Sequence, residues 1–79
     1  MKKLQAYLAH QILWISEYIR QNRQRLGRDK TFDYLNHQYD ELSGAINGAL
    51  VVEALTTEEA DELQDWLADE IDELFDAAA

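Results

Sequence analysis

The apolar residues of this chain recur at intervals of three and four, and no proline interrupts them. That spacing places them along one side of an α-helix, because a helical turn takes 3.6 residues. Glycine occurs only three times, so the chain has few of the turn residues on which β-proteins depend. The sequence therefore predicts an all-α fold built from a few long helices.

Three segments carry the helical pattern. The first covers residues 2–26, and Gly27 after it is typical of a helix C-terminus. The second covers residues 32–55, with Thr31 as its predicted N-cap. The third covers residues 57–76. With 47% hydrophobic residues, the chain has enough apolar surface to pack these helices against one another.

The third segment begins with the pattern Thr56-Thr57-Glu58-Glu59. This matches a capping box, in which a threonine and a glutamate three residues later each bond the other's backbone N–H. Because the connections between segments are short, neighbouring helices are expected to be antiparallel. The prediction is one domain over residues 1–79, a small up-down-up three-helix bundle.

Three aromatic side chains lie together on one flank of the apolar stripe of residues 2–26. They are Tyr7, Trp14 and Tyr18, at helical spacing. Two interpretations remain open. The side chains form the edge of the core, or they form an aromatic strip that binds a partner.

The second half of the segment 32–55 is almost entirely small or apolar. A helix that is apolar around most of its circumference is normally buried on most sides, and two other helices cannot cover all of it. Gly44 and Gly48 lie one turn apart, which fits either a close contact between two subunits or a break near Ser43 to Gly48. The predicted dimer or second interface consists of Tyr34, Gly44, Gly48, Val51, Val52 and Leu55.

Charge is distributed unevenly along the chain. Residues 1–30 carry all seven basic side chains and a net charge of +5, and residues 31–52 carry −3. Residues 53–79 carry eleven acids and no base, and the whole chain has a net charge of −9. This asymmetry indicates a one-sided acidic surface.

The acids of the third segment lie opposite its apolar stripe. Acidic pairs at i,i+3 and i,i+4 number eleven between Glu58 and Asp76, and at about 0.2 to 0.5 kcal/mol each they cost on the order of 2 to 5 kcal/mol. In the bundle, Arg20, Arg23, Arg25 and Arg28 should lie at the same end as Asp72, Glu73 and Asp76, which predicts ion pairs there. We call the following set the acidic face: Glu58, Asp61, Glu62, Asp65, Asp69, Asp72, Glu73 and Asp76.

Two interpretations of the acidic face remain open. It is either a solvated and partly paired surface or a site for a partner with a basic surface. Carboxylates at about 5.4 Å per turn can imitate a phosphate backbone and occupy a nucleic-acid-binding cleft. The chain resembles small acidic helical proteins that block restriction, repair or CRISPR enzymes, in size and charge only. An acidic immunity protein that caps a basic nuclease would use the same physics.

The predicted function is therefore a protein-binding inhibitor or antagonist of the nucleic-acid-mimic type. The alternative is a homodimeric helical adaptor or antitoxin-like regulatory module, whose interface is the small and apolar half of residues 32–55. Five basic side chains between Arg20 and Lys30 favour direct binding of nucleic acid. An overall pI near 4.4 argues against it.

The chain lacks the residues that other functional classes, such as enzymes and metal-binding proteins, need. The chain has no cysteine, so we expect neither disulfides nor a thiolate metal site, and a cytoplasmic location fits best. His10 and His37 lie on different predicted helices without ligand spacing, and neither serine has the context of a catalytic triad. We therefore expect no enzyme, no catalytic residue, no metal and no cofactor. No run approaches about 18 apolar residues, which predicts no membrane span, and no export signal is expected.

Overall fold

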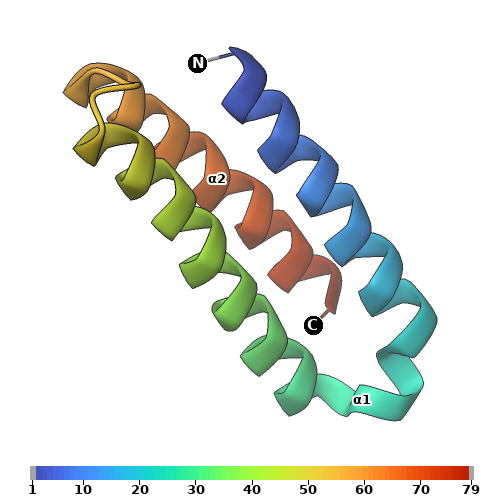
Figure 1. Cartoon of the computed structure of the whole chain (residues 1–79). Helices are drawn as coiled ribbons and strands as arrows, with labels where there is room; N and C mark the ends of the chain where they lie inside the picture. The colour runs from blue at the N-terminus through green and yellow to red at the C-terminus, as the bar shows by residue number, and fades with distance from the viewer. Residues whose placement is uncertain (1, 79) are drawn as a thin grey trace.

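The computed structural model describes residues 2–78 and contains two helices, α1 (Lys2–Val51) and α2 (Thr57–Ala78). α1 folds back on itself, so that its two halves and α2 lie side by side (Figure 1). Segments that follow one another along the chain run in opposite directions. The result is an elongated molecule of 41 × 18 × 17 Å.

The bend in α1 lies at Gly27. Its backbone angles, φ 73° and ψ 174°, are non-helical. This region of backbone space is open almost only to glycine, which has no Cβ to collide with the neighbouring carbonyl groups. Gly27 divides α1 into a first arm (residues 2–26) and a second arm (residues 28–51), which pack against each other (Figure 1).

The prediction of a three-helix bundle is wrong, because the structure has two helices. Residues 27–31 were expected to connect two helices, and they are part of α1 instead. Thr31 is not an N-cap, because it is buried and its hydroxyl donates to the Gly27 carbonyl oxygen at 2.6 Å. One glycine is enough to reverse the direction of the chain, so no separate connection forms.

The break near Ser43 to Gly48, one of the two alternatives for the glycines, is ruled out, since α1 is helical throughout these residues. Leu42 and Ile46 hold this stretch in the core, where they are 6% and 0% exposed. Their burial offsets the roughly 1 kcal/mol by which each glycine weakens a helix.

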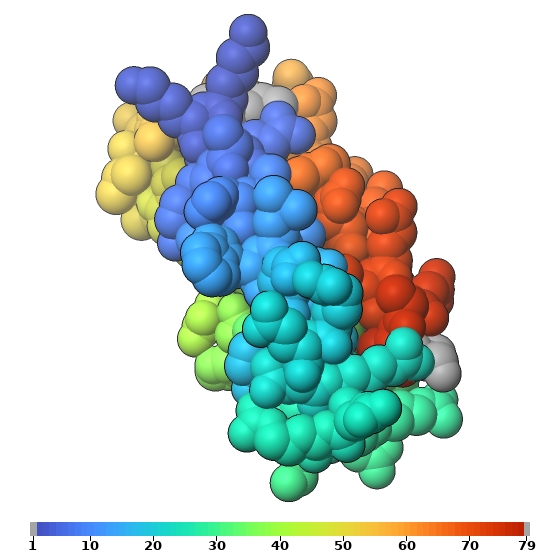
Figure 2. All heavy atoms as spheres, turned by 90° about the vertical axis from the view of Figure 1, so that its right-hand side faces the viewer, coloured from blue at the N-terminus to red at the C-terminus, as the bar shows by residue number. Residues whose placement is uncertain are grey.

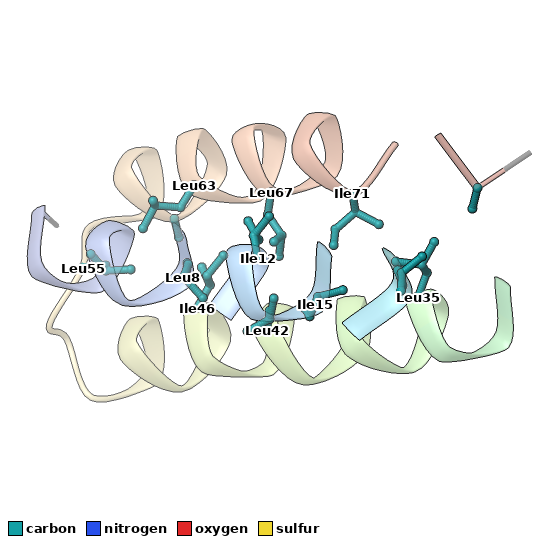
Figure 3. Packing of buried hydrophobic residues seen from close by; sticks show 13 residues of the cluster. Leu8, Ile12, Ile15, Leu35, Leu42, Ile46, Leu55, Leu63, Leu67 and Ile71 are labelled. Atoms are coloured by element: carbon teal, nitrogen blue, oxygen red, sulfur yellow. The ribbon is translucent and has the colours of Figure 1, made fainter. Parts of the chain in front are cut away.

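The hydrophobic core runs along the axis between the two arms and α2 (Figure 3). It is made by the residues of the apolar stripes that the sequence predicts, and they recur every three or four positions. The buried side chains of these stripes are Leu8, Ile12, Ile15 and Ile19 from the first arm, Leu35, Leu42 and Ile46 from the second, and Ala60, Leu63, Leu67 and Ile71 from α2, and the core also includes Leu55 and Ala78.

α1 ends at Val51, four residues before the predicted end, because the backbone turns into a left-handed conformation at Glu53 (φ 62°). The N–H of Ala54 donates to the carbonyl of Ala49 at 2.8 Å, and the N–H of Glu53 donates to that of Leu50 at 3.0 Å. These two bonds are the Schellman pattern that closes many helices. The turn carries the following residues back under the end of the core.

α2 begins with the capping box that the sequence predicts. The backbone N–H of Thr56 donates to Glu59 Oε1 at 2.9 Å, and the N–H of Glu59 donates to Thr56 Oγ1 at 3.1 Å. At its other end α2 continues to Ala78, two residues beyond the predicted end at residue 76. Ala78 is buried among the core residues, and this packing extends the helix.

The capping box makes the stability of α2 dependent on pH. The hydrogen bonds with the Thr56 backbone and hydroxyl lower the pKa of Glu59 from its ordinary value of 4.5. A carboxyl with a lowered pKa in the folded state stabilises the fold above its ordinary pKa, and the contribution is lost as pH falls through the lowered value. Urea unfolding should therefore show Glu59→Gln to be less stable than the wild type at neutral pH, and this difference should shrink as the solution is acidified below pH 4.5.

Glu58→Gln is the matched control, because Glu58 lies in the same turn and makes no capping hydrogen bond within residues 2–78. A destabilisation by Glu59→Gln that stayed the same from neutral to acidic pH would contradict the assignment of the lowered pKa to this carboxyl.

Candidate protein-binding surface

All eight members of the acidic face are exposed on α2. Their position follows from the core, because Leu63, Leu67 and Ile71 occupy the inward side of the helix and the acids take the opposite side. In Figure 2, α2 lies along the right-hand side of the upper and middle part of the molecule, in orange and red. The helix thus presents a row of carboxylates to solvent along its length.

The acidic face has no ion pair with any described residue. Two contacts between a nitrogen-bearing side chain and a carboxylate are present within residues 2–78: the Arg20–Glu17 ion pair at 2.6 Å, and His37 Nε2 at 2.9 Å from Glu41 Oε1. Both lie on α1, and both pairs are exposed. The prediction that Arg20, Arg23, Arg25 and Arg28 pair with the C-terminal end of the acidic face is therefore wrong.

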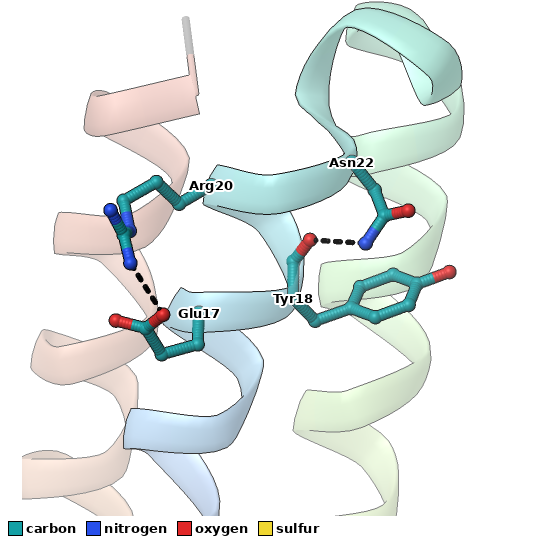
Figure 4. A network of polar contacts seen from close by, with 4 residues as sticks. All are labelled: Glu17, Tyr18, Arg20 and Asn22. Carbon is teal, nitrogen blue, oxygen red and sulfur yellow. Dashed lines mark hydrogen bonds and ion pairs between the residues drawn. The ribbon is translucent and has the colours of Figure 1, made fainter.

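Three of the four arginines contact side chains of their own helix instead. Arg20 reaches back one turn to Glu17 (Figure 4). Arg25 Nη2 donates to Asn22 Oδ1 at 2.6 Å. The guanidinium carbon of Arg28 lies 5.2 Å from the centre of the Phe32 ring, a distance typical of cation–π contacts. Side chains one turn apart are neighbours on a helix surface, so these contacts form within α1.

No family model, curated protein or solved structure matches this chain. Neither α1 nor α2 contains a stretch that is both long enough and apolar enough to cross a membrane. No three His, Asp or Glu side chains within residues 2–78 converge on a point where they could hold a metal ion.

The two histidines lie apart on the two arms of α1. His10 Nε2 accepts a hydrogen bond from the indole N–H of Trp14 at 2.9 Å, and the two rings meet edge to face. His37 contacts Glu41 one turn along the second arm. Each histidine is used in a local contact on its own helix turn.

The residues predicted to form a dimer interface on the second arm do not share one surface. Gly44, Gly48, Val51 and Val52 are exposed. Leu55 is 6% exposed and belongs to the core, because the turn at Glu53 directs the chain inward. The predicted interface is therefore reduced to its glycines and valines.

Tyr34, the sixth residue of that predicted interface, is half-buried and packs against the core. Its ring lies 4.6 Å from that of Tyr18, centre to centre, and joins the two arms of α1. Burial, then the neighbouring Tyr18 and Glu41, raises the pKa of the Tyr34 hydroxyl. Of the aromatic residues on the flank of the first arm, Tyr18 thus fits the core-edge interpretation.

The aromatic flank also contains residues with no cover within the described part of the chain. Tyr7 is 53% exposed and Trp14 is 62% exposed. Leu13, which the sequence reasoning did not single out, is 65% exposed on the same arm. The signal that could have found it is the absence of any charged residue between positions 4 and 16, in a chain that is 29% charged.

Proposed function

We propose that this protein binds a basic surface of a nucleic-acid-binding enzyme through the acidic face and inhibits that enzyme by taking the place of nucleic acid. The observation that carries the proposal is that eight carboxylates stand exposed along one side of α2 without an ion pair from the described residues. Their mutual repulsion is thus not relieved inside the molecule. A partner rich in lysine and arginine would relieve it.

The geometry of α2 suits this function. A helix repeats every 5.4 Å, so a carboxylate on each turn gives a row of charges at fixed intervals. The core and the capping box fix α2 in the fold, and a row that is already ordered loses little entropy on binding. Basic clefts that bind nucleic acid respond first to charge and only then to sequence, so such a row can occupy them.

Binding of this kind is steered by charge and weakened by salt. The middle of the acidic face is the place to test it, because Asp65 and Asp69 are exposed and far from both ends of α2. The variant Asp65→Lys with Asp69→Lys should abolish binding. Helicity should be kept, since four of the five like-charge pairs of these two residues become opposite-charge pairs and only the pair between positions 65 and 69 keeps like charges.

The test uses affinity capture from the native host with the wild type as bait, followed by assays on the purified captured protein. The proposal predicts a captured protein that binds nucleic acid, that releases nucleic acid when this protein is added, and that does not bind the Asp65→Lys, Asp69→Lys variant. The matched control is Asp33→Lys with Asp40→Lys, which makes the same change in net charge at exposed positions of the second arm. Equal binding by the wild type and the α2 variant would refute the proposal.

A further inference from the structure

The outward side of the first arm carries no charge between its two ends, on an otherwise charged protein. Between Lys3 and Glu17 no residue carries a charge. Tyr7, Leu13 and Trp14 are more than half exposed there. Figure 2 shows the first arm, in blue, facing the viewer with no other segment in front of it. Exposed tryptophan and tyrosine side chains in such a group are typical of protein interfaces.

The exposed residues of this surface form three parallel rows. Seven residues make almost two helical turns, so residues seven positions apart fall nearly in line. Lys3, His10 and Glu17 form the middle row. Tyr7 and Trp14 form the row on one side, and Ala6 and Leu13 form the row on the other. A shallow hollow of about 200 Å³ lies among His10, Leu13, Trp14 and Glu17.

We propose that this surface binds a second copy of the same chain, with the two first arms antiparallel and a two-fold axis passing beside His10. The charges favour this occupant. Lys3 and Glu17 lie seven residues to either side of His10 and carry opposite charges. The two-fold axis therefore places Lys3 of each copy opposite Glu17 of the other. Glu17 Oε2 bonds Arg20, and a carboxylate can accept further hydrogen bonds from a lysine.

The two outer rows are also complementary under this two-fold rotation. Tyr7 of one copy comes level with Trp14 of the other, which gives two aromatic pairs. On the opposite side the large Leu13 comes level with the small Ala6 of the other copy. A two-fold interface must be self-complementary, and these rows pair large with small and ring with ring.

The proposed dimer leaves the acidic face free, since the acids lie on α2 and the contact lies on the outer side of the first arm. The two interactions respond differently to salt. At about 0.5 M salt, where charges are screened within a few ångströms, binding of the acidic face to a basic partner should be largely lost. The dimer should persist under the same conditions, because apolar contacts supply most of it.

Sedimentation equilibrium of the purified chain tests the proposal. The wild type should dimerise reversibly, and Trp14→Ala should weaken the dimer on the order of thirtyfold or more, as expected for a tryptophan at an interface centre. Lys3→Glu and Glu17→Lys should each weaken it about tenfold or more by placing like charges opposite each other. Trp14, Lys3 and Glu17 are all exposed, so the fold should remain, and circular dichroism checks this.

Mixing the two charge variants gives the decisive result. A Lys3→Glu chain facing a Glu17→Lys chain regains both opposite-charge pairs, so a heterodimer should form where neither variant dimerises well alone. Val52→Ala is the control for loss of an exposed apolar side chain elsewhere, and it should leave the dimer unchanged. The proposal is overturned by a wild type that stays monomeric at millimolar concentration, by a mixture without heterodimer, or by a dimer that Gly48→Leu abolishes and Trp14→Ala does not.

Discussion

Gly27→Ala is expected to lower the free energy of unfolding by about 1 to 3 kcal/mol, the usual cost of a side chain in a backbone region reserved for glycine. A Cβ at this position would meet no atom within 4 Å, so the loss would come from backbone strain and not from a collision. Alanine also restricts the unfolded chain, which offsets a small part of the strain. Urea unfolding followed by circular dichroism measures the difference. The loss is large against the roughly 5 to 15 kcal/mol of an ordinary domain.

Gly44→Ala is the matched control for this measurement. Gly44 is helical, and a Cβ there also meets nothing within 4 Å. The same chemical change should therefore raise the free energy of unfolding by about 0.4 to 1 kcal/mol, because alanine favours the helix and restricts the unfolded chain. Opposite signs for the two variants would establish that the bend needs a glycine. A Gly27→Ala variant as stable as the wild type, with unchanged mass in solution, would show that it does not.

The double variant Asp65→Asn, Asp69→Asn is expected to raise the free energy of unfolding by about 1 to 2.5 kcal/mol. The two substitutions remove five like-charge pairs at i,i+3 and i,i+4, each worth about 0.2 to 0.5 kcal/mol. Asparagine and aspartate have similar helix propensity, so the gain would reflect charge alone. The gain should shrink at high salt, which screens exposed charges. Thermal and urea unfolding at low and high salt measure it.

The control for this second prediction is Asp33→Asn with Asp40→Asn on the second arm. Asp33 has one acidic neighbour at helical spacing, Asp29, and one basic neighbour, Lys30, while Asp40 has no acidic neighbour at that spacing. The control should therefore change stability little. An α2 variant no more stable than the wild type at low salt would mean that repulsion between the acids does not weaken the fold. The inhibitor proposal would then lose its energetic basis.

A gain of stability together with a loss of binding would explain why the chain retains these acids. Residues selected for solubility alone could alternate in sign and stabilise the helix. Acids gathered on one side of α2 lower the stability of the free protein and favour binding to a partner that neutralises them. Measuring both stability and partner binding on the Asp65→Asn, Asp69→Asn variant therefore distinguishes a binding surface from a merely solvated one.

Local sequence pattern was sufficient for several features of the fold. Helical content, the buried stripes and the start of α2 follow from spacing and capping residues that interact within one or two turns. Leu8, Leu35 and Leu67 are each fully buried, at positions that the periodicity assigns to the core. The exposure of the acidic face follows in the same way, because the side of a helix opposite its buried stripe faces solvent.

The tertiary structure decided where the chain turns and which charges meet. Sequence could not tell that Gly27 alone reverses α1, because a glycine is equally compatible with a loop and with a one-residue bend. It could not tell that Glu53 would take a left-handed conformation and place Leu55 in the core. These outcomes depend on how the helices fit against one another, which no local pattern encodes.

The acidic face shows most clearly which features the sequence determines and which depend on the tertiary structure. The sequence by itself determined that eight acids share one side of a helix, because a helix has a fixed period. Only the tertiary structure decided that they have no ion pair with the described residues, because Arg20 bonds Glu17 on its own arm. Helical periodicity sets which direction a side chain faces. The distance between charges on different helices depends on packing and on the reach of each side chain.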